Sequence, residues 1–106
     1  KRLSAKVRST LEMRIKRSVP GWALASRGVD DIANMNILGA SLDAMAEAVK
    51  LVWEQVQADP ALAGLPCIVT VDGPYRLRAW SRSPQQAVVS GDHLSLAVAA
   101  ASILAK

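Results

Sequence analysis

The sequence predicts a mixed α/β fold in which helices pack on a small mixed sheet. Two observations support this prediction. A long helical repeat of apolar residues occupies residues 38–56, and a short β-branched run follows it at residues 67–72. A run with almost no polarity is typical of a buried strand, and buried strands are usually parallel members of an α/β sheet. A long helix that precedes such a strand favours the layered α/β architecture.

The first helix is predicted from a cap, an apolar stripe and a proline. Ser4 is a candidate N-cap, because its hydroxyl can accept a hydrogen bond from the first helical turn. The helix should end before Pro20, since the residue that precedes a proline avoids the α region. Between them, apolar residues recur at a spacing of four: Val7, Leu11 and Ile15.

Turn residues and short apolar runs order the rest of the chain. Residues 21–25 have the composition of a short edge strand, and a helix with two aspartates in its first turn should follow. The long helix should end at Asp59, which precedes a proline. A loop over residues 75–84, a second strand over residues 87–89 and a last helix that Asp92 opens complete the prediction.

Length and composition bound the kind of protein. A chain of 106 residues, 51% hydrophobic and 21% charged, has enough apolar material for one globular domain. It starts with Lys1 instead of Met and ends without a capping Gly or Pro, so we expect a piece of a longer protein, truncated at both ends. We also expect no membrane segment, because no signal peptide or long apolar stretch is visible. We expect the protein to be a monomer.

The single cysteine, Cys67, excludes a disulfide framework within the chain and fits a reducing compartment, which we take to be the cytoplasm. With the single histidine, His93, it could form a nucleophile pair. We interpret Cys67 instead as a small buried hydrophobe and His93 as a solvent-facing residue of a first helical turn.

Positive charge is concentrated at the start of the chain, where Glu12 is the only acidic residue among the first seventeen. A basic arm of this kind can bind phosphates, and the same pattern also fits a solvated helix face. Asp43 and Glu47 lie four residues apart in the long helix, and we interpret them as surface charges instead of a metal pair. The basic residues of the arm are Lys1, Arg2, Lys6, Arg8, Arg14, Lys16 and Arg17.

Two aspartates follow the two predicted strands. Asp72 closes the buried strand, and Asp92 comes directly after the next strand. Sites in α/β folds gather beyond the carboxyl ends of strands, so the two carboxylates can converge there. Carboxylate oxygens suit Mg²⁺ or Mn²⁺, and two such ions can hydrolyse a phosphodiester. As alternatives, Asp92 is a helix N-cap and Asp72-Gly73 is a turn pair.

The exact letters around these aspartates carry a resemblance to a known family. Val71-Asp72-Gly73, the segment AVVSGD at residues 87–92 and the segment AAASILAK at residues 99–106 resemble ribonuclease HII. The segments KRLS at residues 1–4 and NIL at residues 36–38 are similar to elements of the same family and occur in the same order. The resemblance therefore extends over the whole chain.

This resemblance implies a partial ribonuclease H-like fold, with residues 1–106 forming part of one catalytic domain. It also implies an endonuclease that uses Mg²⁺ or Mn²⁺ to hydrolyse RNA in RNA–DNA hybrids, including single ribonucleotides embedded in duplex DNA. Asp72 and Asp92 match the third and fourth of the family's four acidic residues. The adjacent Asp-Glu pair and the Gly-Arg-Gly segment that complete the family's site are absent, so we expect this piece alone to be inactive.

Substrate contacts are expected from Lys1 and Arg2, which match a segment that approaches the nucleic acid. A phosphate could also reach the arginines of the loop between the two aspartates, which are Arg76, Arg78 and Arg82. Two departures from the family pattern bear on activity. Pro74 stands where the family commonly has Asn, and Ser90 stands where it usually has Lys. The alternative function is a non-catalytic nucleic-acid-binding α/β module.

Overall fold

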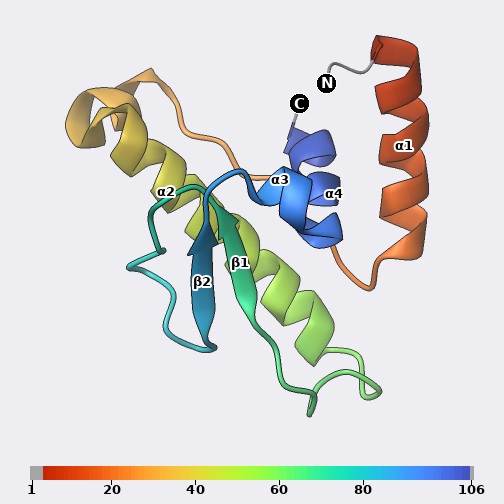
Figure 1. The fold of residues 1–106 in the computed structure, drawn as a ribbon. Helices are drawn as coiled ribbons and strands as arrows, with labels where there is room; N and C mark the ends of the chain where they lie inside the picture. The colour runs from red at the N-terminus through yellow and green to blue at the C-terminus, as the bar shows by residue number, and fades with distance from the viewer. Residues whose placement is uncertain (1–3, 106) are drawn as a thin grey trace.

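The computed structural model describes residues 4–105, without the side chains of residues 93 and 94 (Figure 1). Lys1 and Arg2 therefore lie outside the described residues. The chain is a mixed α/β structure, which confirms the predicted class. Its elements in order are α1 (Ala5–Ser18), α2 (Val29–Gln57), β1 (Val69–Asp72), β2 (Gln85–Val88), α3 (Gly91–Leu94) and α4 (Leu96–Ala105).

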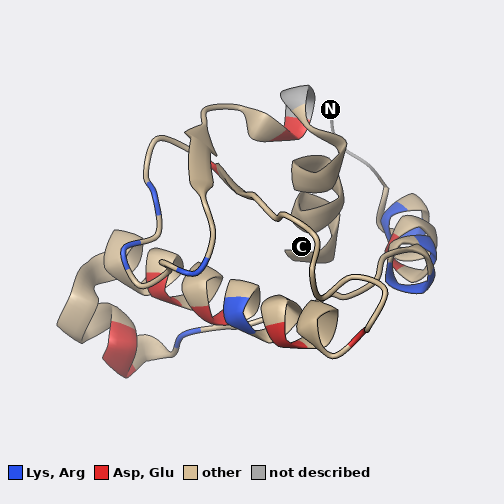
Figure 2. Ribbon diagram, turned by 90° about the horizontal axis from the view of Figure 1, so that it is seen from below, with Lys and Arg blue, Asp and Glu red and all other residues tan. Residues whose placement is uncertain are grey.

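Helix α1 begins and ends where its sequence predicts. The Ser4 hydroxyl accepts a hydrogen bond from the Val7 N–H at 3.2 Å, which satisfies one of the donors that a helix start leaves open. The helix ends at Ser18, two residues before Pro20. It stands at one side of the structure, next to α4 (Figures 1 and 2).

Strands β1 and β2 form a parallel pair, as predicted for the β-branched run. Val69 pairs with Gln85, and Asp72 pairs with Val88. Beyond the last pair, the Gly73 N–H donates to the Val88 carbonyl at 2.9 Å. The second strand begins two residues earlier than predicted. Because the pairing is parallel, both strands point their carboxyl ends at the same edge of the sheet.

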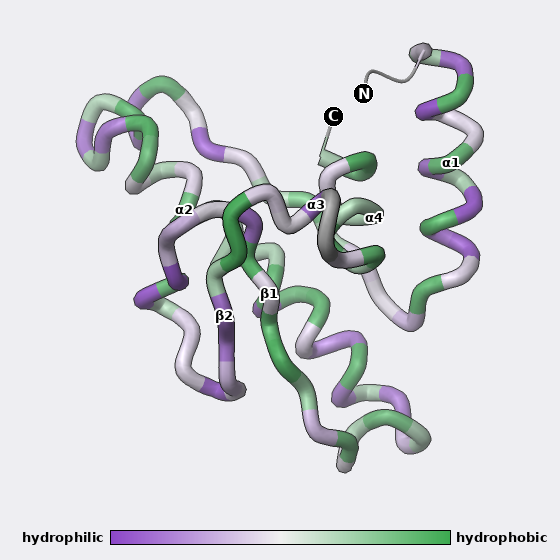
Figure 3. The backbone as a smooth tube through the Cα atoms, viewed as in Figure 1, coloured by the Kyte–Doolittle hydropathy of each residue, from purple (hydrophilic) through white to green (hydrophobic). Residues whose placement is uncertain are grey.

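The core lies between this sheet, α2 and the loop that joins β1 to β2. Its buried members are Val71, Leu77 and Trp80, and partly buried apolar residues of α2 pack against them. The rings of Trp53 and Trp80 meet edge to face, with centroids 5.3 Å apart and planes at 72°. Figure 3 shows hydrophobic (green) segments along β1, in which Val71 is buried and Val69 packs against the core.

Helix α2 contains the predicted long helix and a sharp break near its start. Asn36 has a φ of 62° and a ψ of 173°, values that interrupt the helix. Its Oδ1 accepts a hydrogen bond from the Gly39 N–H at 2.9 Å, so Asn36 caps the part of α2 that follows it. The helix ends at Gln57, just before Asp59, as predicted.

The predicted edge strand at residues 21–25 is wrong, because this segment has no regular structure. Its backbone hydrogen bonds go to a side chain of α2 instead. Gln55 accepts from the Trp22 N–H through Oε1 at 3.0 Å and donates to the Trp22 carbonyl through Nε2 at 2.9 Å. A Cβ at Gly21 would lie 2.7 Å from Gln55 Oε1, so only glycine fits at this position without a shift.

The predicted last helix is divided in two. Ser95, with a φ of −136° and a ψ of 126°, separates α3 from α4, and its hydroxyl accepts a hydrogen bond from the Val98 N–H at 3.3 Å. Asp92 lies inside the first turn of α3, and Ser90 is the residue that precedes this helix. The expectation that Asp92 is the N-cap of the last helix is therefore wrong.

A further expectation concerns the burial of the apolar run at residues 65–68. Cys67 is half-buried and lies before β1, with its Sγ 3.6 Å from the Leu65 carbonyl oxygen, so it is not a core residue. The neighbouring Ile68 is 60% exposed, which shows that only part of the apolar run is buried.

Within residues 4–105, no helix combines the length and the apolar character that a bilayer crossing requires.

The Gln55–Trp22 contact predicts a measurable effect on stability. Replacing Gln55 with Ala removes two hydrogen bonds to the Trp22 backbone and should lower the free energy of unfolding by about 1 kcal/mol. Urea unfolding of the complete gene product measures this change. Gln57→Ala is the matched control, because the Gln57 side chain makes no hydrogen bond with the described residues. Equal losses in the two variants would contradict the prediction.

Candidate functional site

The carboxyl edge of the sheet brings the two predicted aspartates together. Asp72 is the last residue of β1, and its Oδ1 accepts a hydrogen bond from the Gly91 N–H at 2.9 Å. Asp92 follows Gly91 directly, in the first turn of α3. Both aspartates are exposed residues. The two residues therefore lie at the same edge of the sheet, with Gly91 in direct contact with Asp72.

Gly91 makes this close approach possible. Its backbone is buried between Asp72 and α4, and a Cβ on it would lie 3.2 Å from Val98 Cγ1 and 3.6 Å from Asp72 Oδ1. Ser90, just before it, has a φ of 56° in the left-handed region, which turns the chain from β2 into α3. The role of Gly91 was not predicted from the sequence, although a glycine next to a candidate ligand is a signal for close backbone approach.

Asp72 takes both of the alternative roles that the sequence suggests for the two aspartates. Asp72, instead of Asp92, satisfies an N–H at the start of a helix, because it binds the first residue of α3. Gly73, with a φ of 120°, gives the Asp72-Gly73 pair the geometry of a turn. A carboxylate has two oxygens, so the hydrogen bond at Oδ1 leaves Oδ2 of Asp72 without a hydrogen-bond partner among the described residues.

These two carboxylates are candidates for part of the ligand set of a divalent cation. Exposed carboxylate oxygens on adjacent element ends suit a hard ion such as Mg²⁺ or Mn²⁺. Within the part of the chain that the structure describes, no group of three or more His, Cys, Asp or Glu side chains could hold a metal ion. The residues present therefore fit the role of two ligands, and the other ligands of such an ion would have to come from water, substrate or other residues.

The loop between the strands is fixed by one glutamine that sequence analysis did not identify. Gln85 accepts from the Leu77 N–H at 2.7 Å through Oε1 and donates through Nε2 to the carbonyls of Leu77 at 2.8 Å and Trp80 at 3.1 Å. Leu77 and Trp80 are both buried in the core. The loop is therefore anchored at its centre, and its polar residues lie on the outside.

The arginines of this loop are all exposed, but Arg76 and Arg82 lie near opposite edges of the sheet. Arg76 lies four residues after Asp72, on the segment that leaves the carboxyl edge. Arg82 lies close to Pro84, whose carbonyl accepts from the Val69 N–H at 2.9 Å at the amino edge. A four-residue strand separates these edges by about 10 Å or more. Arg76 is thus better placed than Arg82 to contact a phosphate near the two aspartates.

Asp43 and Glu47 are engaged by an arginine, which confirms that they are surface charges. Arg27 Nε lies 2.7 Å from Asp43 Oδ2, and Arg27 Nη1 lies 2.7 Å from Glu47 Oε1. Hydrogen bonds to these two carboxylates raise the pKa of the Arg27 guanidinium above its ordinary value. The arginine thereby fixes the irregular segment before α2 to the middle of that helix.

Comparison with known proteins finds relatives along the entire chain. Three of them, each named ribonuclease HII, align with all 106 residues: those of Caulobacter vibrioides, at 40% identity, Erythrobacter litoralis, at 35%, and Idiomarina loihiensis, at 40%. The whole chain is homologous to ribonuclease HII. It spans 44%, 48% and 50% of the length of these three relatives, respectively. No family model and no solved structure matches the chain.

Three of the segments that carry the ribonuclease HII resemblance, around Asp72, around Asp92 and in α4, lie next to one another. Helix α4, which holds the segment AAASILA, packs against both α3 and β1, with Val98 buried between them. The ribonuclease H-like α/β fold that this homology implies agrees with the observed mixed α/β arrangement. The two departures from the pattern, Pro74 and Ser90, are exposed residues on either side of the aspartates.

The role of Gly91 predicts a local loss of stability on substitution. Gly91→Ala places a Cβ against Val98 and should lower the free energy of unfolding by about 1 kcal/mol. Gly64→Ala is the matched control, because nothing lies within 4 Å of a Cβ built there, and its effect should stay within about 0.5 kcal/mol. Urea unfolding of both variants measures the difference. A neutral Gly91→Ala would show that α3 does not depend on this close approach.

Proposed function

We propose that the protein hydrolyses the RNA strand of RNA–DNA hybrids, including single ribonucleotides embedded in duplex DNA, with the help of a divalent metal ion. The observation that supports this most is the meeting of Asp72 and Asp92 at the carboxyl edge of β1 and β2, in a chain whose relatives are named ribonuclease HII. In this proposal residues 1–106 are part of a single catalytic domain that acts as a monomer. Cys67 has no disulfide partner, which fits a cytoplasmic protein.

Asp72 and Asp92 are the residues that would hold Mg²⁺ or Mn²⁺. A bound ion supplies a Lewis acid and an activated water for attack on a phosphodiester. The chain's own contribution is positional. The Gly91 N–H binds Oδ1 of Asp72 and fixes the plane of that carboxylate, and the same backbone presents Asp92 from the adjacent residue. Further ligands would come from outside these residues, so we expect the 106-residue piece alone to be inactive.

The substrate would be positioned through its phosphates. Arg76 is exposed on the segment that leaves Asp72, where a guanidinium could bind a phosphate next to the scissile bond. Lys1 and Arg2, which lie outside the described residues, are proposed to approach the same nucleic acid. Contacts of this kind set the register of the duplex and make its affinity depend on salt.

A second candidate function is a non-catalytic nucleic-acid-binding module. It is favoured by Ser90, which stands beside Asp92 without the positive charge that ribonuclease HII usually has there. This function predicts salt-sensitive binding of duplexes with no metal-dependent cut in the complete gene product. The cleavage assay described next distinguishes it from the first proposal.

Asp72→Asn in the complete gene product should lower the cleavage rate of a duplex with one embedded ribonucleotide by about 100-fold or more, because it removes a negative ligand of the metal ion. Asparagine keeps an oxygen that can accept the Gly91 N–H, so the fold should be retained. Asp59→Asn is the matched control, since Asp59 also accepts a backbone N–H, from Ala61 at 3.0 Å, away from the site. Full activity of Asp72→Asn would reject the assignment.

Metal binding itself can be observed without cleavage. Titration with Mn²⁺, a paramagnetic ion, should broaden the NMR signals of Asp72 and Asp92 in the complete gene product and leave those of Asp59 unchanged. The broadening should vanish when EDTA is added. Equal broadening at all three aspartates would indicate non-specific binding, and no broadening at Asp72 and Asp92 would contradict the proposed ligands.

A further inference from the structure

Helix α1 carries far more positive than negative charge, and its one acidic residue is already paired. Lys16 Nζ lies 2.8 Å from Glu12 Oε2, and the same ammonium group lies 4.2 Å from the centre of the Trp22 ring. Lys16 therefore turns toward the protein and neutralises Glu12. The other basic residues of the helix are Lys6, Arg8, Arg14 and Arg17.

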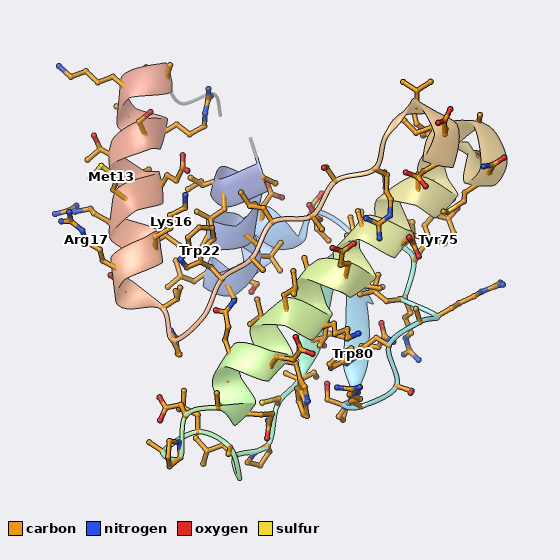
Figure 4. All side chains as sticks on the ribbon, turned by 180° about the vertical axis from the view of Figure 1, so that it is seen from behind. Met13, Lys16, Arg17, Trp22, Tyr75 and Trp80 are labelled. Carbon is orange, nitrogen blue, oxygen red and sulfur yellow. The ribbon has the colours of Figure 1, made fainter. Side chains whose placement is uncertain are left out.

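Three of these residues form a basic stripe, which we define as Lys6, Arg14 and Arg17. Together with Thr10 they follow spacings of four, four and three residues, which places them on one side of a helix. All three are exposed, and none of them makes an ion pair with the described residues. Figure 4 shows Arg17 pointing away from the rest of the structure, while Lys16 points inward to Trp22.

The opposite side of α1 faces the protein, so the stripe does not serve packing. Leu11 and Ile15 are half-buried on that side, and α1 lies against α4. Seen from below, α1 shows the densest group of basic residues in the structure (Figure 2). This side of the helix contributes charge to the surface without contributing contacts to the fold.

The dimensions and chemistry of the stripe match a nucleic-acid backbone. Arg17 lies eleven positions after Lys6, which corresponds to about 16 Å along a helix axis. One strand of a duplex places a phosphate about every 3.4 Å of its axis, so several phosphates lie within this reach. Arginine binds phosphate oxygens through two parallel N–H groups, and lysine binds them as a point charge.

We propose that the basic stripe is a second nucleic-acid contact, separate from the Asp72–Asp92 site, which binds the phosphate backbone of the duplex without reading its sequence. The choice of a duplex as partner rests on the proposed function. An anionic membrane surface fits less well, because the two exposed large apolar residues of α1, Val7 and Met13, are six positions apart and form no continuous apolar face. The half-buried apolar residues of the helix lie on the side that faces α4.

The test is a binding titration of the complete gene product with a fluorescent DNA duplex that contains one ribonucleotide, in EDTA so that no cleavage occurs. The variant is Lys6→Gln with Arg14→Gln, which leaves the favourable positive charge of Arg17 at the end of α1 in place. Each lost phosphate contact lowers the slope of log affinity against log salt by about 0.9, so the slope should fall by about 2 and the affinity by about tenfold. Adding Arg17→Gln should lower both further.

The matched control is Lys50→Gln with Arg82→Gln, which removes one exposed lysine of α2 and one exposed arginine of the loop between the strands, both of which line the same pocket. It has the same change in net charge and should leave the salt slope nearly unchanged. Equal losses in the two double variants would overturn the proposal, because net charge alone would then explain binding. No loss in the stripe variant would overturn it as well. Thermal unfolding by circular dichroism checks that each variant is folded.

Two further measurements distinguish backbone binding by the stripe from recognition of the ribonucleotide and from binding to lipid. An all-DNA duplex of the same length should lose affinity to the same degree, since the stripe binds backbone alone; a loss confined to the ribonucleotide duplex would contradict it. Vesicles that contain phosphatidylserine should bind more weakly than either duplex, and stronger, stripe-dependent vesicle binding would assign the stripe to lipid. Duplex binding is measured without metal, so its result does not depend on cleavage. The stripe proposal can therefore be rejected while Asp72-dependent cleavage is confirmed, and the cleavage proposal can be rejected while stripe-dependent binding is confirmed.

Discussion

The parallel pairing of β1 with β2 is the constraint on which the rest of the structure depends. Its register sets Asp72 opposite Val88, so the chain that leaves β2 must start α3 beside the end of β1. An antiparallel pairing would have sent the end of β2 to the opposite edge. A shift by one residue would have turned Val71 out of the core and reversed the direction of Asp72. The backbone hydrogen bonds between β1 and β2 therefore determine at which edge of the sheet both aspartates lie.

Two glutamines give order to the segments that lack regular structure. Gln55 binds both backbone groups of Trp22, and Gln85 binds those of Leu77 together with the Trp80 carbonyl. An amide side chain presents a donor and an acceptor in nearly the same arrangement as a peptide group, so it can replace a missing strand partner. Gln55 belongs to α2 and Gln85 to β2. Each glutamine therefore holds an irregular segment in a fixed position relative to a helix or a strand.

Much of the fold could be predicted from local patterns. The N-cap at Ser4, the helix ends before Pro20 and near Asp59, and the parallel β-branched strand all follow from signals within a few residues. The edge strand at residues 21–25 was wrong because the partner of Trp22 lies 33 residues away in α2, beyond any local pattern. The break at Ser95 was missed because two serines and an aspartate within six residues are all acceptable caps, and composition does not rank them.

The candidate site shows the same division. The position of Asp72 and Asp92 at one edge of the sheet could be predicted, since it depends only on topology, whereas the hydrogen bond from the Gly91 N–H to Asp72 depends on side-chain geometry. The separation of Arg76 from Arg82 required the loop path, which Leu77 and Trp80 determine from the core. The spacing of Lys6, Arg14 and Arg17 was visible in the sequence, but their lack of ion-pair partners among the described residues was not.

The two-stranded sheet also has a consequence for handling the protein. Within residues 4–105, β1 and β2 pair only with each other, so each leaves one row of backbone N–H and carbonyl groups open along its outer side. Ile68 and Val89, which flank these strands, are 60% and 66% exposed. Open strand edges with apolar neighbours are templates for intermolecular pairing. The isolated 106-residue chain should therefore self-associate as its concentration rises, and dilute samples with low salt will keep it dispersed longest through its net charge of +4.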